Sequence, residues 1–112
     1  MTPRINLCIP KYLQMGFSAY TFTATITFPI KSYMAEPLLA RLRPIYNTSV
    51  GCFKSKGKWY VQVHKVFEYS TTNPQTVIDN ALVTKNRMCW AMAKVKETYY
   101  ANKAETYEDS IV

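Results

Sequence analysis

Residues 20–28 read YTFTATITF and alternate strictly between apolar side chains and threonine. The even positions carry aromatic and aliphatic side chains, and the odd positions carry four threonines. Because successive side chains of a β-strand point to opposite faces of a sheet, this pattern predicts a strand with one buried face and one threonine face. Pro29 is expected to close the strand, because proline cannot donate a hydrogen bond to the ladder.

A short helix is predicted directly after this strand, over residues 32–43. Ser32 is its expected N-cap, and Pro37 is compatible only with the first helical turn. Pro44 is expected to stop the helix. The apolar side chains of the segment fall on one helical stripe, which comprises Met34, Leu38, Leu42 and Ile45.

Two further strands are predicted to form a hairpin, with residues 49–54 and 58–69 as arms and residues 55–57 as the turn. Gly57 supplies the positive φ that a tight hairpin turn requires. The face of the second arm expected to be buried carries Trp59, Val61, Val63, Phe67 and Tyr69. The opposite face carries Lys58, Tyr60, Gln62, His64 and Val66.

A long C-terminal helix is predicted from Pro74 to about Asn102, with Asn73 as its N-cap. Lys85 lies in line with the apolar stripe of this helix. Two alternatives follow: the helix is kinked near residues 84–86, or the Lys85 stem runs along the surface to bring its charge to water. The main apolar stripe comprises Val77, Ala81, Met88, Met92, Val95 and Tyr99.

Together with a short strand predicted at residues 5–9, these elements indicate an α+β domain. The expected architecture is a four-stranded antiparallel sheet with two helices on one face, ferredoxin-like (split β-α-β) or similar. The strand at residues 5–9 would take the fourth, edge position. The other face of the sheet is expected to be open and lined by the threonines with Tyr60, Gln62 and His64.

The charge of the chain is distributed unevenly. Residues 1–104 carry all fourteen basic side chains and four acidic ones, a net charge of +10, whereas residues 105–112 carry three acids and no base. We therefore divide the chain into a single basic domain, 1–104, and an acidic C-terminal tail, 105–112. Such a basic body attracts polyanions, mainly nucleic acid or an acidic protein face. The tail is expected either to be solvated or to fold back on the body.

The composition disfavours several classes of catalyst. The four acids of residues 1–104 are scattered, so neither a glycosidase carboxylate pair nor a two-metal cluster is expected. Three glycines form no phosphate-binding loop, and one histidine provides no triad or zinc-protease motif. Three widely spaced cysteines indicate neither a disulfide framework nor a zinc site. We predict no enzyme activity, no metal, no cofactor, and a reducing, cytoplasmic location.

The hairpin provides the first group of candidate binding residues. Lys54, Lys56 and Lys58 place three ammonium groups within five residues, where they can hold phosphates. The alternative is a solvated turn whose lysines discourage pairing at the sheet edge. Tyr60 follows on the open face, placed to stack one base. His64 lies farther along the same face and is expected to be a surface imidazole.

The long helix provides the second group. Trp90 lies opposite the apolar stripe, with Arg87 and Lys94 on either side. Three interpretations compete: an interaction hot spot, an aromatic side chain that stacks on a base, or a side chain turned inward and covered by basic stems. Val83 extends the same strip, so a homodimer through this helix is a further alternative.

These two groups favour a non-catalytic binding protein that holds nucleic acid by charge, through the lysine-rich hairpin and the basic helix face. The alternative is a small protein-interaction or inhibitor module, of the kind found among viral and mobile-element proteins, that docks on an acidic protein partner. Residues 12–30 carry no charge but alternate between apolar and polar side chains, so no membrane contact is expected.

Overall fold

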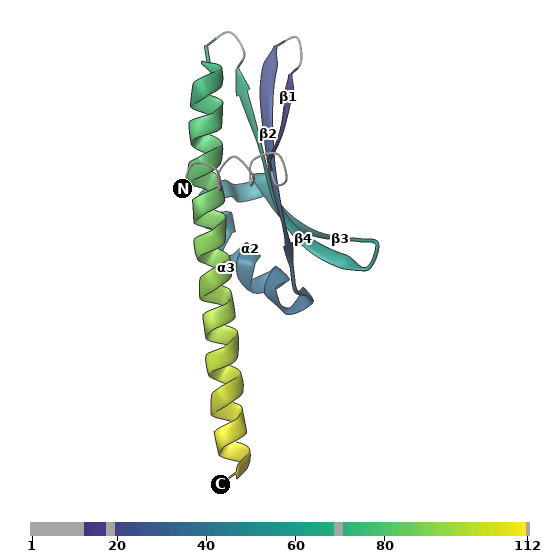
Figure 1. Cartoon of the computed structure of the whole chain (residues 1–112), viewed down its shortest axis with the longest axis vertical. Helices are drawn as coiled ribbons and strands as arrows, with labels where there is room; N and C mark the ends of the chain where they lie inside the picture. Colours follow the sequence, from purple (N-terminus) through teal and green to yellow (C-terminus); the bar gives the residue numbers. More distant parts are fainter. Residues whose placement is uncertain (1–12, 18–19, 69–70, 112) are drawn as a thin grey trace, which may run out of the picture.

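The computed structural model describes residues 13–17, 20–68 and 71–111, with side chains described through residue 104 (Figure 1). A four-stranded sheet lies against two helices, and the second helix runs along most of the 63 Å length of the molecule. The elements in chain order are β1 (Leu13–Phe17), β2 (Thr21–Ile30), η1 (Ser32–Met34), α2 (Ala35–Tyr46), η2 (Asn47–Ser49), β3 (Val50–Ser55), β4 (Lys58–Glu68) and α3 (Pro74–Ile111).

The strands form one antiparallel sheet in the order β1-β2-β4-β3. The prediction of an α+β fold with a four-stranded antiparallel sheet and two helices is therefore confirmed. The standard ferredoxin-like topology is wrong, because it ends on a strand that follows the second helix, whereas here the edge strand β1 precedes β2 and pairs with it directly. Residues 13–17 take this edge position, and the strand predicted at residues 5–9 lies outside the described residues.

Alternation along β2 divides the sheet into two faces. Ala24, Ile26 and Phe28 are buried, whereas the threonines between them are only partly covered. The predicted half-buried strand is therefore confirmed. Its end is one residue later than predicted, because Ile30 still pairs with Trp59 after Pro29.

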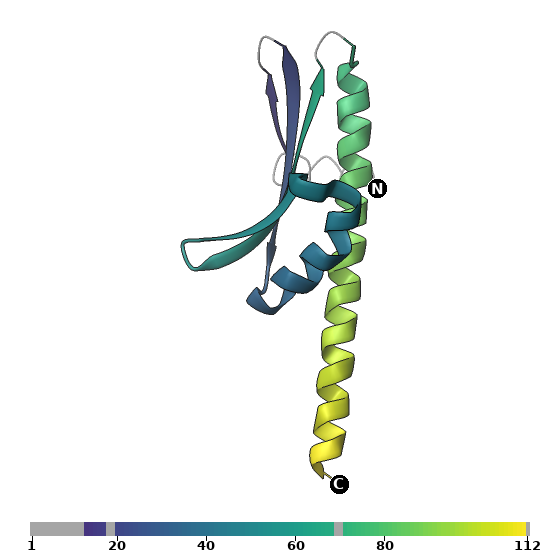
Figure 2. The ribbon, with the colours of Figure 1, turned by 180° about the vertical axis from the view of Figure 1, so that it is seen from behind.

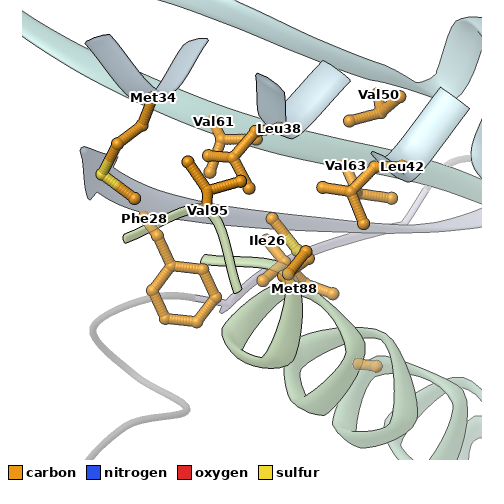
Figure 3. Close-up of a cluster of buried hydrophobic side chains, with 12 residues drawn as sticks. Ile26, Phe28, Met34, Leu38, Leu42, Val50, Val61, Val63, Met88 and Val95 are labelled. Carbon is orange, nitrogen blue, oxygen red and sulfur yellow. The ribbon is translucent and has the colours of Figure 1, made fainter. Parts of the chain in front are cut away.

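Both helices pack on the same apolar face of the sheet, where their side chains interlock in one core (Figures 1 and 3). Each buried aliphatic side chain of this kind stabilises the fold by about 1.5–3 kcal/mol. Trp59 and Phe67, expected to be buried, are only half-buried because they lie toward the two ends of β4, away from the core cluster. The sheet and helices meet through Ile26, Phe28, Val61, Val63, Leu38, Leu42, Met88 and Val95.

The segment after β2 begins with the 3-10 turn η1 and continues as α2. Ser32 is not the N-cap, because it lies inside η1 and α2 begins three residues later. Pro44 does not stop the helix, which runs on to Tyr46 and ends where Asn47 adopts a φ of 52°. Ile45 is 45% exposed, so the buried stripe ends at Leu42.

The N-terminus of α3 is formed as predicted. The Asn73 side-chain oxygen accepts a hydrogen bond of 2.8 Å from the backbone N–H of Gln75, and Pro74 takes the first helical position. The helix passes residues 84–86 without interruption (Figure 2), so the kinked alternative is wrong. Its buried stripe has near-heptad spacing and comprises Val77, Ala81, Thr84, Met88, Ala91 and Val95.

The C-terminal end of α3 lies beyond its predicted limit. The helix continues past Asn102 to Ile111, since residues 103–111 contain neither glycine nor proline to end it. Residues 105–111 thus extend α3 away from the sheet (Figure 2), and their backbone does not fold back on the body. The division of the chain at residue 104 stays a prediction. Within the described ranges, no helix is long and apolar enough to cross a bilayer.

Candidate nucleic-acid interface

The β3–β4 hairpin closes with a two-residue turn in which both residues have a left-handed backbone. Lys56 has a φ of 51° and Gly57 a φ of 79°, between the paired residues Ser55 and Lys58. Positive φ at both central positions is characteristic of a type I′ turn, which favours Asn-Gly. A lysine in this conformation costs about 1–2 kcal/mol. The hairpin therefore carries a cation at its tip in spite of an unfavourable backbone conformation.

A hollow of about 540 Å³ lies where the hairpin meets the end of β2, and lysines and a tryptophan line it. The sheet register explains its position. Ile30, Trp59 and Lys54 stand in one row across β2, β4 and β3. Lys31 follows Ile30 directly, and Lys58, the first residue of β4, adds a third ammonium group.

The side chains around this hollow suit a phosphate with an attached base or sugar. Each lysine offers three N–H donors and a full positive charge to phosphate oxygens. Half-buried Trp59 offers ring surface for stacking. Neither Lys31 nor Trp59 was among the predicted site residues. Lys31 is distant in sequence from the hairpin, and Trp59 alternates in phase with the core residues of β4.

The other predicted hairpin residues lie outside this hollow. Tyr60 is on the open face, where its ring stacks on Phe53 with centroids 5.3 Å apart. His64 is exposed on the same face, with its Nδ1 2.8 Å from the hydroxyl oxygen of Thr25. The open face predicted from the alternation is therefore present, and cross-strand polar contacts order it.

The predicted α3 residues form a separate group. Figure 1 shows the β3–β4 hairpin projecting away from α3, and the hollow that the hairpin lysines line has no residue in common with the hollow beside Trp90. Val83, Arg87 and Trp90, with Asn86, line a shallow hollow of about 360 Å³ on α3. The Lys94 ammonium lies 4.0 Å from a carboxylate oxygen of Glu97. The predicted site is thus divided between two regions of the molecule.

The described residues offer little nucleophilic or metal-binding chemistry. Across residues 13–17, 20–68 and 71–111, no group of three His, Cys, Asp or Glu residues is placed to hold a metal ion. Burial raises the pKa of the Cys52 thiol, against a weaker opposing effect of Arg43. Cys52 pairs with Val61 on the covered face, whereas His64 lies on the open face, so the two do not form a catalytic pair.

Comparison with known proteins identifies no relative: no protein-family model, no curated protein and no solved structure matches this chain.

Proposed function

We propose that this chain is a non-catalytic nucleic-acid-binding protein whose β3–β4 hairpin makes the main contact. The observation that carries the proposal is the hollow beside the hairpin, where Lys31, Lys54 and Lys58 surround Trp59. Lys56 adds a fourth cation at the exposed tip. Contacts from lysine to phosphate provide affinity that is independent of base sequence.

The basic face of α3 has a secondary role in this proposal. Arg87 and Lys94 contribute to the positive field that draws a polyanion toward the protein. The ion pair between Lys94 and Glu97 is exposed, and such pairs contribute only about 0–1 kcal/mol. Lys94 is therefore free to exchange this partner for a phosphate. The cytoplasm is the compartment we propose for this interaction.

The test is the salt dependence of oligonucleotide binding, measured by fluorescence anisotropy with a labelled single strand and a labelled duplex. Replacing Lys54, Lys56 and Lys58 together by alanine should reduce the slope of log K against log salt. The expected reduction is about two to three units, because each phosphate contact contributes about 0.7–0.9. Affinity at low salt should fall in parallel.

A matched control removes the same net charge elsewhere. It replaces three α3 lysines that lie outside both predicted groups, Lys85, Lys96 and Lys103. A loss confined to the hairpin variant would identify local contacts, whereas equal losses in both variants would contradict the hairpin assignment. No measurable binding to DNA or RNA at low salt would contradict the proposal as a whole.

A second candidate function is a protein-interaction or inhibitor module that docks on an acidic partner or on a second copy of this chain. It is favoured by the α3 hollow, in which Trp90 is 48% exposed beside Val83. In that case Trp90→Ala should weaken association by about 2 kcal/mol or more, as measured by sedimentation or by titration with the partner. Affinity purification from the native host, with and without nuclease, separates the two candidates, because only a protein partner survives nuclease treatment.

A further inference from the structure

The sheet face turned away from the helices carries an aromatic pair beside a polar row. Phe53 and Tyr60 are cross-strand neighbours whose ring planes lie within 22° of each other. Phe53 is 39% exposed, so part of its ring is open to solvent. The next row on this face lies two residues along the strands, about 6.6 Å away at 3.3 Å per residue, and comprises Gly51, Gln62 and Thr27.

The polar row has room and hydrogen-bonding capacity beside the rings. Apart from its chain neighbours, no heavy atom of the described residues lies within 4 Å of where a Cβ on Gly51 would stand. Gln62 Nε2 donates to the hydroxyl oxygen of Thr27 at 3.1 Å, which orients the amide. A side-chain amide has two N–H donors and a carbonyl acceptor. The bond to Thr27 uses one N–H of Gln62, which leaves one N–H and the carbonyl oxygen to contact a ligand.

His64 adds a second oriented polar group one row farther on. Its Nδ1 lies 2.8 Å from the Thr25 hydroxyl oxygen, which fixes the ring across β2 and β4. The other ring nitrogen, Nε2, can donate or accept depending on the tautomer. From the hairpin inward, the open face therefore presents a stacking surface and then two side chains, Gln62 and His64, that can both donate and accept hydrogen bonds.

We infer that this face binds the unpaired bases of a single-stranded nucleic acid, with one base stacked on the Phe53–Tyr60 pair and the next reaching Gln62. This inference rests on the proposed function and specifies its substrate class. Between Lys58 and Glu68, the open-face residues of β4 include no lysine, arginine or carboxylate. Bases suit such a surface, while the phosphates lie toward Lys54, Lys56 and Lys58 at the hairpin.

A duplex does not fit the same surface. Its bases are stacked on one another and expose only their edges in the grooves, so they cannot lie flat on Phe53. Unpaired bases can be splayed out and stacked on aromatic side chains, which contributes about 1–3 kcal/mol per base and tolerates any base. Single strands should therefore bind more tightly than duplexes of the same length.

The experiment compares a short fluorescein-labelled oligothymidylate with the same strand annealed to oligoadenylate, over the same series of salt concentrations. Wild-type protein should bind the single strand at least tenfold more tightly. Phe53→Ala should weaken single-strand binding roughly tenfold and leave the salt slope unchanged, because Phe53 contacts no phosphate. Phe53→Trp should restore binding, which shows that a lost fold does not explain the alanine result.

The matched control is Phe17→Ala, because Phe17 is also an exposed phenylalanine in a ring pair, with Phe22, but does not lie on the open face. It should leave binding unchanged. Equal affinity for strand and duplex, or unchanged binding by Phe53→Ala, would overturn the inference. If the hairpin lysine variant still lost binding in that case, the proposed function would stand; absence of all oligonucleotide binding would overturn both.

Discussion

The guanidinium carbon of Arg41, on α2, lies 6.0 Å from the centre of the Trp90 ring on α3. This distance is within the range of a cation–π contact. The cation that approaches the ring is thus from the neighbouring helix, and not one of the two basic residues beside Trp90 in sequence. Trp90 belongs partly to the contact between α2 and α3 and partly to the surface.

Trp90→Ala should lower the free energy of unfolding by about 2 kcal/mol, roughly half of the 3–5 kcal/mol that removal of a fully buried aromatic costs. Urea unfolding measures this change. In a double-mutant cycle with Arg41→Ala, the coupling should be about 0.5–1 kcal/mol. In the matched cycle with Arg43→Ala, the losses in free energy of unfolding should simply add. A loss of about 3–5 kcal/mol from Trp90→Ala alone would show a fully buried side chain and contradict this prediction.

Ile26→Ala should lower the free energy of unfolding by about 2–5 kcal/mol, because Ile26 is 1% exposed in the core. Its neighbour Thr25 lies on the open face and bonds to His64. Thr25→Ala should therefore cost about 1 kcal/mol or less. Chemical denaturation of both variants gives the comparison, and similar costs would mean that a second layer or a partner covers the threonine face.

Lys56→Asn should raise the free energy of unfolding by about 0.5–1 kcal/mol, because asparagine tolerates positive φ better than lysine does. It should also weaken nucleic-acid binding, because it removes the cation at the tip. Gly57→Ala should lower stability by about 1 kcal/mol or more. Thermal and urea unfolding test both; Lys54→Asn, within β3, is the control and should not stabilise.

Asn73→Ala should destabilise the protein by about 1 kcal/mol, because it removes the acceptor for the Gln75 N–H at the start of α3. Asn73→Asp keeps the acceptor and places a negative charge at the positive end of the helix dipole, so it should be neutral or stabilising. Urea midpoints of the two variants test the cap. Equal losses for alanine and aspartate would contradict a capping role.

The pKa of the Tyr33 phenol is raised by burial, by its hydrogen bond with Tyr100 and by the nearby tyrosines. The fold therefore favours the neutral phenol. This contribution to stability is complete below the unfolded pKa of about 10 and is lost as the pH rises through the higher folded pKa. The difference in unfolding free energy between wild type and Tyr33→Phe should be constant near neutrality. Above about pH 10, wild type should lose stability relative to Tyr33→Phe. A difference that stays constant across this pH range would contradict this assignment.

Local patterns predicted most of the fold. The alternation in β2, the Gly57 turn and the Asn73-Pro74 helix start depend on neighbouring residues, and these are the features the structure confirms. The edge strand at residues 13–17 was not predicted, because these residues include Gly16 and have little alternation of their own. Their pairing with β2 stabilises them as a strand, and that is a tertiary contact.

The candidate site was less predictable, because its parts meet through sheet register. Lys31 joins Lys54 and Lys58 only because Ile30 pairs with Trp59. Phe53 meets Tyr60 through the register of the β3–β4 hairpin. Composition and charge indicated a polyanion, but which cations share a hollow depends on a pairing between distant segments.

The pairing of β2 with β4 also affects the order in which the chain folds. Thr25 and His64 are 39 positions apart, so their ladder requires closure of a long loop that contains α2. The β3–β4 hairpin needs no such closure, and a hairpin of this kind forms in about 1–10 μs. We expect β2 to dock onto a preformed hairpin. The turn that presents the lysines would then also be the place where the sheet nucleates.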